Sequence, residues 1–600
     1  MTGFVDQEKI LGEKMNISNS AQAVGPTTPI SIDIDEMKYR MKGESFSQKI
    51  ERIARTLSDG DIHYRSLTDA LINMRFLPAG RIQTAIGSPR NVTAYNCFVS
   101  RKIEDSMDSI MDAAKEAAET MRRGGGIGYN FGHIRPHGDW IKSLESKASG
   151  PISFMKIFDA VCQTIASSGH RRGAQMAVFP VSHPDIFEFI NAKTNENALT
   201  GFNVSVAVTD EFMDCLENNK PFDLKFEGKV YQTVDPNEIW EAIMRNTFDW
   251  AEPGIIFIDR INQENNLYYC EEIEATNPCG EQPLAPYSAC LLGSFNLVKY
   301  VDTKLPHDAF GDKTFNFDQF ITDIAVVVRA MDNVIDNTTY PLHQQEVEAK
   351  NKRRMGLGVT GLANAGEMLG FAYGSKNFLD FQRNVLRVLR DEAYVTSSKL
   401  AKEKGSFPLY DQDKYLEGKF IKRLPDQVKE MIRQNGMRNS HLTSIAPTGT
   451  ISLLADNVSS GIEPPFSHYY DRTLRTFDGD QIVRVEDYAY SKGIKGQTAD
   501  EISAEDHVAV LCAAQEYVDS ACSKTCNVGD QVTYDEFKNL YFLGWKNGAK
   551  GMTTFRASGK RFGILNKIEE NTTSNASTPD AEVGIDACYI DPKTGIKSCE

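Results

Sequence analysis

Apolar residues recur along the chain with two different periods. Near the N-terminus they lie three or four positions apart, a spacing that gathers them on one face of a helix: Ile50, Ile53, Ala54 and Leu57. From residue 76 to about residue 565, helical stretches alternate with short β-rich runs such as residues 203–208 and 254–258. We therefore expect a small helical domain over residues 31–75 and a large α/β domain with many crossovers over residues 76–567.

The two ends of the chain are polar. Residues 1–30 lack the apolar stretch of a signal peptide and are expected to form a flexible leader. Asn, Thr, Ser, Glu and Pro dominate residues 569–582, which predicts a flexible tail over residues 568–600. This tail carries only two widely spaced cysteines, Cys588 and Cys599, whereas a zinc site would need two close pairs. A mobile dithiol that reduces a deeper site is favoured over dispensable tail cysteines.

Composition and charge exclude some classes of function. The 600 residues include 66 Lys and Arg against 82 Asp and Glu, and the net charge of −16 argues against broad electrostatic binding to nucleic acid. A local Arg cluster can still bind a small anion. No apolar run approaches the ~18 residues of a membrane span, so a cytoplasmic protein is expected. In that compartment the 11 cysteines would be mostly reduced, and a disulfide among them would be catalytic.

The stretch richest in chemical groups is Asn277-Pro278-Cys279-Gly280-Glu281, with Cys290 shortly after it. Pro restricts the backbone and Gly relaxes it, so a tight loop can project the amide, the thiol and the carboxylate to one side. Such a set can perform hydrogen-atom or proton chemistry on a small polar ligand. For this run alone, a buried structural cysteine in a turn is an equally good interpretation.

A second candidate site lies nearer the C-terminus. A Pro/Gly turn there opens onto a helical stretch, so that backbone N–H groups and hydroxyls can meet a phosphate: Pro447, Thr448, Gly449, Thr450, Ile451 and Ser452. An ordinary Thr or Ser helix cap is the alternative. The glycine run at 124–128 is not a dinucleotide-binding fingerprint, because that fingerprint follows a strand and residues 109–123 predict a helix.

Several separate motifs, in one order, resemble those of the catalytic subunit of ribonucleotide reductase. Among the classes of that family, the adenosylcobalamin-dependent one is the most similar. The resemblance covers residues 76–565, about four fifths of the chain. Besides residues 277–281 and 447–452, it rests on Leu77-Pro78-Ala79-Gly80-Arg81, Asn96-Cys97, Arg122-Arg123-Gly124-Gly125-Gly126-Ile127-Gly128, Gly169-His170-Arg171-Arg172-Gly173-Ala174, His183-Pro184-Asp185-Ile186, Phe202-Asn203-Val204-Ser205-Val206 and Arg353-Arg354-Met355-Gly356-Leu357-Gly358.

The resemblance implies a ten-stranded α/β barrel whose central finger loop carries a thiyl cysteine. Cys279 matches that cysteine, which removes a hydrogen atom from C3′ of a ribonucleotide. Glu281 matches the base that takes the 3′-OH proton, and Asn277 matches the amide that holds the ribose. Residues 447–452 match the loop that binds the substrate's phosphates.

The resemblance also implies a chain of thiol–disulfide exchange. Cys97 and Cys290 match the dithiol that supplies two electrons in each turnover. Cys588 and Cys599 would reduce that pair again, with thioredoxin or glutaredoxin as the external reductant.

The resemblance further implies an effector, a deoxynucleotide or ATP, that selects which base is reduced. Asp105 matches the residue that holds the effector's ribose, and Arg135 one that meets its phosphates. The flexible loop between effector and substrate would comprise Ser168, Gly169, His170, Arg171, Arg172, Gly173 and Ala174. An apolar helical stripe before this loop is either a core face or the face on which the family forms its dimer: Phe154, Ile157, Phe158, Val161, Cys162 and Ile165. A homodimer is expected, and the leader is too short for an ATP-cone.

The radical source separates the classes of the family. Enzymes that take their radical from a ferritin-like subunit carry adjacent tyrosines near the C-terminal end of the barrel, whereas residues 550–561 contain none. This favours adenosylcobalamin as the cofactor. A chain that needs a radical-generating subunit is the alternative, and an inactive nucleotide-binding protein is a remote one. Diphosphate and triphosphate substrates both stay open, and no protein metal ligands are assigned.

Overall fold

The structure is a computed structural model that describes residues 25–165, 174–194, 198–302, 314–476, 479–556, 558–559, 589–590 and 597–598. Its N-terminal part is helical and consists of α2 (Pro29–Ile34), the π-helical turn η1 (Asp35–Tyr39), α3 (Phe46–Leu57) and α4 (Asp61–Ile72). A capping box of Ser45 and Gln48 begins α3. The apolar stripe expected on α3 is confirmed as buried, and it joins the same core as α12 (Phe317–Asp336) and α15 (Lys376–Lys404).

The larger of two central sheets has the strand order β13-β2-β3-β6-β7-β10-β19-β18. Strands β2, β3, β6, β7 and β10 are parallel, β19 is antiparallel to β10 and parallel to β18, and β13 is antiparallel to β2. The bounds are β2 (Cys97–Val99), β3 (Gly126–Asn130), β6 (Gln175–Pro180), β7 (Phe202–Val208), β10 (Gly254–Phe257), β13 (Ala289–Cys290), β18 (Thr525–Val528) and β19 (Gly551–Arg556).

The smaller sheet consists of β1 (Phe76–Pro78), β14 (Leu292–Asn296) and β15 (Gly356–Thr360), with β14 in the middle. Only Leu291 separates β13 of the large sheet from β14 of the small one. On the other side, β15 forms a parallel bridge to Thr443, and Ile445 forms a parallel bridge to Cys522, just before β18. The two sheets are thus connected at both ends.

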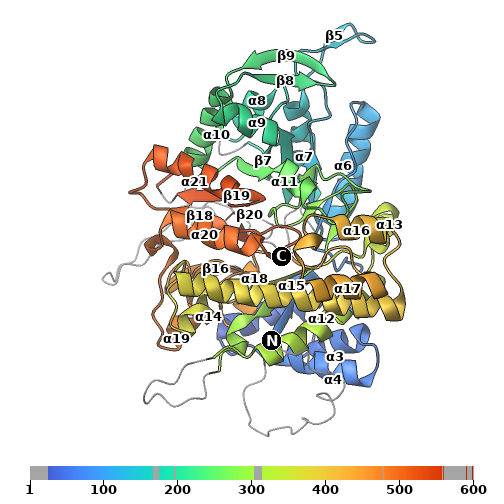
Figure 1. The fold of residues 1–600 in the computed structure, drawn as a ribbon, viewed down its shortest axis with the longest axis vertical. Helices are drawn as coiled ribbons and strands as arrows, with labels where there is room; N and C mark the ends of the chain where they lie inside the picture. The colour runs from blue at the N-terminus through green and yellow to red at the C-terminus, as the bar shows by residue number, and fades with distance from the viewer. Residues whose placement is uncertain are drawn as a thin grey trace.

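Helices surround these sheets. In Figure 1, α6 (Met107–Arg122), α7 (Pro151–Ile165) and α10 (Pro236–Trp250) lie in the upper half with β7, whereas α12, α15 and α17 (Asp426–Asn435) cross the lower half. The described chain therefore has mixed α/β content, as its pattern predicts. Helix α6 confirms the helix expected at 109–123, because Ser106 caps it and its alanines are buried against the sheet.

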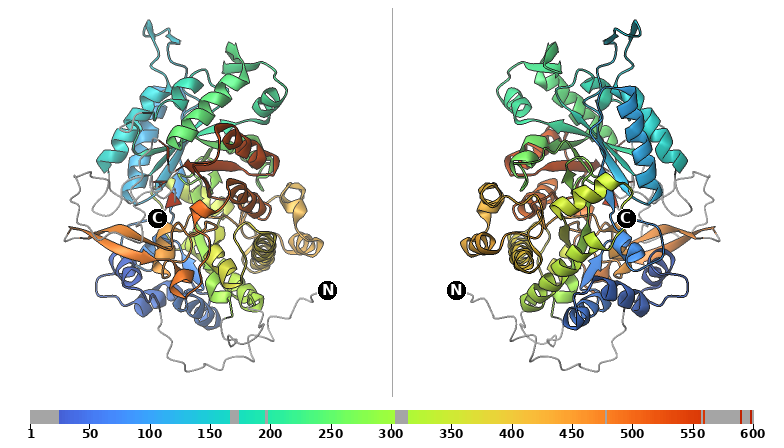
Figure 2. Two further views of the ribbon diagram at one scale, coloured as in Figure 1. Left: turned by 90° about the vertical axis from the view of Figure 1, so that its left-hand side faces the viewer. Right: turned by 90° about the vertical axis from the view of Figure 1, so that its right-hand side faces the viewer.

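Shorter elements complete the fold. The β16 (Tyr469–Thr476) and β17 (Gly479–Glu486) hairpin projects from one side of the molecule (Figure 2). In the tail, β20 (Tyr589–Ile590) pairs with β21 (Lys597–Ser598). The others are α5 (Gly80–Ala85), β4 (Trp140–Ile141), β5 (Ser146–Lys147), α8 (Ile186–Ile190), α9 (Asp210–Glu217), β8 (Phe222–Phe226), β9 (Lys229–Val234), α11 (Ile258–Gln263), η2 (Leu297–Tyr300), α13 (His343–Lys352), α14 (Leu362–Met368), α16 (Gln412–Glu417), η3 (Ile421–Arg423), α18 (Gly449–Leu454), α19 (Tyr488–Ser491), η4 (Ala499–Glu501), α20 (Ala504–Gln515) and α21 (Tyr534–Lys546). Within the described ranges, no helix is both long and apolar enough to cross a bilayer.

Candidate active site

The loop with the amide, the thiol and the carboxylate is the tip of a short hairpin. Strand β11 (Ala275–Thr276) pairs with β12 (Pro283–Leu284), and residues 277–282 connect them. Asn277 closes the loop, because its Oδ1 accepts the backbone N–H of Gln282 at 2.9 Å and its own N–H donates to the Gln282 carbonyl at 3.1 Å. Gly280 has φ of +80°, a conformation that a glycine adopts without strain.

Four surrounding elements hold this hairpin in place. On β3, a Cβ added to Gly128 would lie 1.8 Å from the carbonyl oxygen of Thr276, so only glycine permits the observed approach. From β7, the Asn203 side chain donates to the Pro278 carbonyl at 2.9 Å. The Glu281 carbonyl accepts the Ser444 hydroxyl at 2.9 Å and a backbone N–H of residue 521 at 3.0 Å. The tip is therefore fixed by contacts from distant parts of the chain.

All three functional side chains of the tip are buried: Asn277 and Glu281 are 0% exposed and Cys279 is 1% exposed. Because the Asn277 oxygen is used within the loop, its buried Nδ2 is the group left to bind a ligand, and it has no hydrogen-bond partner among the described residues. Cys279 is disulfide-bonded in this structure, so its thiol chemistry begins with reduction. None of the eight other described cysteines is part of a disulfide.

Cys97 and Cys290 are brought together as expected. They are directly opposite each other where β2 pairs with β13, both are 0% exposed, and neither is part of a disulfide. Burial raises the pKa of the Cys290 thiol well above its usual value, and contact with Cys97 and the nearby negative charge of Glu281 raise it further. A Cβ added to Gly126 would lie 3.2 Å from both the Cys97 sulfur and the Pro278 ring, which places this dithiol beside the hairpin.

The loop expected to bind phosphates does not begin its helix with an ordinary threonine cap. Thr448 precedes α18 in the left-handed conformation, with φ of +58°, and its side chain does not cap the helix. Its hydroxyl instead contacts the Thr360 hydroxyl at 2.9 Å and accepts the Gly461 N–H at 2.7 Å, while the Ser452 hydroxyl donates to the Gly449 carbonyl at 3.0 Å. The hydroxyls of Thr448 and Ser452 therefore have protein partners that brace the loop, and phosphate binding by residues 447–452 stays a prediction.

A cavity of about 20 Å³ lies between this loop and the dithiol strand. Ala446, Thr448, Thr450 and Ile451 contribute to its lining, and the other lining residues come from segments far away in sequence: Tyr39, Ala79, Gly80, Asn96, Leu292, Gly293 and Ser294. The cavity thus joins three motifs found in the sequence, at residues 77–81, 96–97 and 447–452. Asn96, which lines the cavity, directly precedes Cys97 at the start of β2.

A buried charge network behind Cys290 was missed by sequence reasoning. Arg354 donates through Nη2 to Glu271 at 2.5 Å and through Nε to His441 at 3.2 Å, and Lys352 donates to the same glutamate at 2.6 Å. The positive charge of Arg354 lowers the pKa of Cys290 and so partly opposes the effect of burial. The only available signal was the arginine pair in the motif at 353–358, to which no role was assigned.

The two residues expected at the effector site are also brought together. Arg135 donates through Nε to Asp105 at 2.6 Å and through its backbone N–H to the other carboxylate oxygen at 3.2 Å. Residues 168–173 of the expected specificity loop lie outside the described residues, as do Cys588 and Cys599. Ala174, which is described, is buried, and its carbonyl accepts the N–H of Ile127 at 2.9 Å. Residues 126–128 of the glycine run begin β3 and lie against the hairpin.

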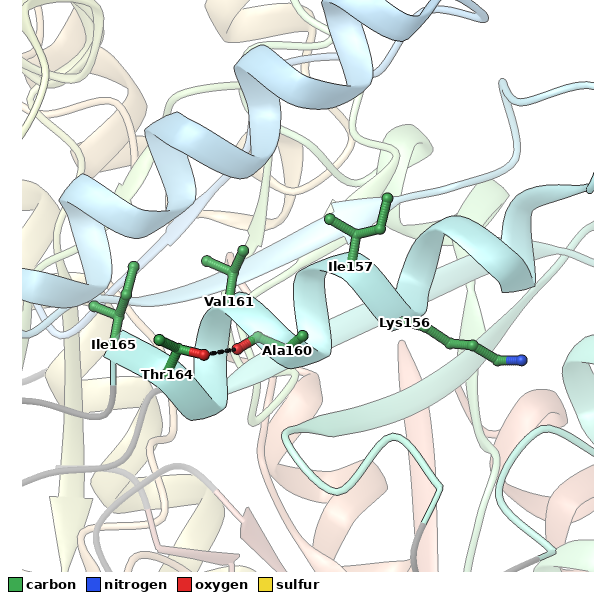
Figure 3. A pocket seen from close by; sticks show the side chains of 6 residues that line it. All are labelled: Lys156, Ile157, Ala160, Val161, Thr164 and Ile165. Carbon is green, nitrogen blue, oxygen red and sulfur yellow. Dashed lines mark hydrogen bonds between the residues drawn. The ribbon is translucent and has the colours of Figure 1, made fainter.

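The apolar stripe on α7 has two faces. Phe158 and Cys162 are buried in the core. Ile157, Val161 and Ile165 leave the helix on another side and are only partly buried (Figure 3). They line an open hollow of about 480 Å³ together with Lys156, Ala160 and Thr164. The core interpretation is confirmed for the face with Phe158 and Cys162, and the dimer interpretation stays a prediction for the other face.

An α/β framework that buries a dithiol beside a third, loop-borne cysteine defines an oxidoreductase that works through thiols. Residues 95–555 match the family described as ribonucleotide reductase, barrel domain. This chain belongs to the ribonucleotide reductase family.

Full-length relatives agree with this assignment. The vitamin B12-dependent ribonucleoside-diphosphate reductase of Mycobacterium tuberculosis (strain CDC 1551 / Oshkosh) is 33% identical over 564 residues, which cover 87% of this chain and 77% of the relative. A protein of the same name from Thermoplasma acidophilum is 35% identical over 546 residues, or 84% of this chain and 67% of the relative. The ribonucleoside-diphosphate reductase large subunit of Caenorhabditis elegans is 25% identical over 564 residues, which cover 81% of this chain and 70% of the relative.

Proposed function

We propose that this chain reduces ribonucleoside diphosphates to 2′-deoxyribonucleoside diphosphates by a thiyl-radical reaction and takes its radical from adenosylcobalamin. The observation that carries the proposal is the convergence of Asn277, Cys279 and Glu281 on one hairpin tip beside the opposed thiols of Cys97 and Cys290. The names of the relatives at 33% and 35% identity support both the diphosphate substrate and the cofactor.

We further propose that the two sheets form one ten-stranded barrel around the hairpin. One half of the barrel would consist of five parallel strands: β2, β3, β6, β7 and β10. The other half would also have five strands: β13 continued by β14, β15, residues 443–445, residues 522–528 and β19. The halves would meet in antiparallel pairs at β10–β19 and β2–β13, which the observed pairings support. Contacts to the hairpin from both halves, through Gly128, Asn203 and Ser444, support its central position.

In the proposed reaction, the Cys279 thiyl removes the hydrogen atom from C3′ of the ribose. Glu281 takes the 3′-OH proton, and the amide Nδ2 of Asn277 donates to the substrate and holds it. The 2′-OH leaves as water when it receives a proton. Cys97 and Cys290 supply two electrons and two protons and become a disulfide, after which Cys279 returns the hydrogen atom to C3′. Burial of all five side chains excludes water, which protects the radical.

The residues at the tip fit a bulky cofactor beside Cys279. Among the described residues, none has an atom within 4 Å of a Cβ built on Gly280, which supports a cofactor site on this side of the tip. When bound, adenosylcobalamin supplies the radical. Strand β19, near the place where a tyrosine relay would be expected, contains no tyrosine. Since the space lies at Gly280, we expect Cys279 and Gly280 to face the cofactor.

The remaining parts of the proposal concern partners. Asp105 and Arg135 would bind a deoxynucleotide or ATP effector, and Cys588 and Cys599 would pass electrons from thioredoxin or glutaredoxin to the dithiol. Support for a homodimer comes from the partly exposed apolar face of α7, with Ile157, Val161 and Ile165.

The test is an anaerobic assay of the full chain with adenosylcobalamin, dithiothreitol, CDP and each effector. We expect dCDP to form, and we expect Cys279→Ser to abolish its formation while CDP binding persists. Cys270→Ser, at an exposed free cysteine, is the matched control and should stay active. Product formation only after addition of a ferritin-like subunit would refute the cofactor assignment, and turnover by Cys279→Ser would refute the mechanism.

A further inference from the structure

The segment just before the helical domain is bonded to the helix that follows the phosphate loop. Asp456, at the C-terminal side of α18, accepts the backbone N–H groups of Thr27 at 2.7 Å and Thr28 at 3.0 Å, and it accepts the Thr27 hydroxyl at 2.8 Å. The buried Ser31 hydroxyl donates to the Leu453 carbonyl at 2.6 Å. Four hydrogen bonds thus connect residues 27–31 with α18, more than 400 positions later in the chain.

Shortly after this segment, Tyr39 contributes to the lining of the small cavity. This side chain is 3% exposed and lines the cavity with Thr448 and Thr450. A Cβ added to Gly80, at the start of α5, would lie 2.8 Å from Cε1 of Tyr39 and 3.3 Å from its Oη. The tyrosine ring therefore lies directly over Gly80, and glycine is needed there to make room for it.

Buried polar contacts fix the position of Tyr39. The Lys49 ammonium lies 5.6 Å from the centre of the Tyr39 ring and forms a buried ion pair with Asp35. Lys49 also donates to the Gln83 side-chain oxygen at 2.9 Å, and Gln83 in turn donates to the Pro78 carbonyl at 2.8 Å. These bonds connect η1 and α3 with α5, which forms another part of the cavity wall.

We propose that residues 27–39 belong to the substrate site: Tyr39 forms the wall that the substrate's phosphates meet opposite residues 448–451, and Thr27, Thr28 and Ser31 hold α18 at the required distance. This inference rests on the proposed function, because it takes the cavity to be the phosphate end of a nucleotide site. The segment lies before residue 95, where the match to the family's barrel domain begins. It gives the N-terminal helices a part in substrate binding.

The experiment measures CDP binding to the full reduced chain by titration calorimetry, together with kcat and KM in the anaerobic assay. We expect Tyr39→Ala to weaken CDP binding about ten-fold and to raise KM more than it lowers kcat. Tyr39→Phe should keep most of the affinity, because it preserves the ring over Gly80. Asp456→Ala should also weaken CDP binding, because it releases three of the four bonds to α18.

Asp33→Ala is the matched control, since Asp33 is exposed on α2 between the bonded residues. It should bind CDP as the unchanged chain does. If Tyr39→Ala proves unfolded by circular dichroism, Tyr39→Leu keeps bulk at the wall and should still weaken binding. Unchanged CDP affinity in folded Tyr39 and Asp456 variants would overturn the inference and leave the proposed function intact. A failure of the unchanged chain to bind CDP would instead refute the proposed function and this inference with it.

Discussion

Arg135 holds Asp105 by two hydrogen bonds, from its Nε at 2.6 Å and from its backbone N–H at 3.2 Å. The side chains of the pair are 34% and 22% exposed, so a ligand can reach both. Two residues expected to bind one effector therefore bind each other in this structure. A bound effector would form hydrogen bonds with both residues: its phosphates with the Arg135 guanidinium, and a ribose hydroxyl with the Asp105 carboxylate.

Replacement of Asp105 by alanine is expected to weaken effector binding about ten-fold and to remove the effector's influence on which base is reduced. The melting temperature should hardly change, because a partly exposed ion pair contributes only about 1 kcal/mol or less. Calorimetric titration with deoxynucleoside triphosphates and competition between CDP and ADP would measure both effects. Asp112→Ala is the control, since Asp112 forms a similar surface pair with Arg101 at 3.2 Å. Unaltered base selection in Asp105→Ala would contradict the assignment.

Gly128→Ala is expected to disrupt the hairpin. The added methyl carbon would meet the Thr276 carbonyl oxygen at 1.8 Å, and neither backbone can move without breaking strand pairing. We expect a loss of about 3 kcal/mol or more of folding stability, or an inactive protein with a displaced tip. Gly126→Ala, where the nearest atoms lie at 3.2 Å, should be milder. Thermal melts and the anaerobic assay would compare the two; equal behaviour would argue against the close approach at Gly128.

The buried Cys290 should resist alkylation near neutral pH. Its raised pKa keeps the thiol protonated, and only the thiolate reacts with iodoacetamide. In the reduced protein at pH 8 we expect Cys290 to react ~10-fold or more slowly than the exposed Cys270, with a rate that still rises above pH 9. Peptide mass spectrometry of timed samples would measure both rates. Equal rates at pH 8 would show that burial does not protect this dithiol.

Glu367 on α14 should make stability fall as the pH rises. Burial, with the nearby negative charge of Asp487, raises the pKa of Glu367 to about 8. Because the unfolded chain has a carboxyl pKa near 4.5, the folded state loses stability between pH 4.5 and pH 8, by about 5 kcal/mol at most. Glu367→Gln should therefore raise the melting temperature at pH 8 and leave it nearly unchanged at pH 4.5. Glu430→Gln, on the exposed side of α17, should show no such difference.

Regular elements could be predicted from the sequence because their signals are local. The apolar spacing at 109–123 and 154–165 predicted α6 and α7, and the runs at 203–208 and 254–258 predicted β7 and β10. Strands β11, β12 and β13 have two residues each, too few for any period to be recognised.

The site was less accessible to such reasoning. The pairing of Cys97 with Cys290 spans almost 200 positions, and only the family resemblance pointed to it. The phosphate-binding role of residues 447–452 stays a prediction, and the partners of the Thr448 hydroxyl, Thr360 and Gly461, come from other segments that sequence reasoning could not connect with it. No sequence pattern pointed to Tyr39, because its ring packs over Gly80 only in the folded chain.

The β11–β12 hairpin has only two cross-strand pairs of its own, and its placement depends on Gly128, Asn203, Ser444 and residue 521. In directed evolution, substitutions at Asn203 or Ser444 could therefore change rate or substrate preference although neither side chain need meet the nucleotide. A library restricted to the tip would miss them. The most productive positions for redesign are those whose contacts fix the orientation of the hairpin tip. These positions lie up to 240 residues away from the tip along the chain.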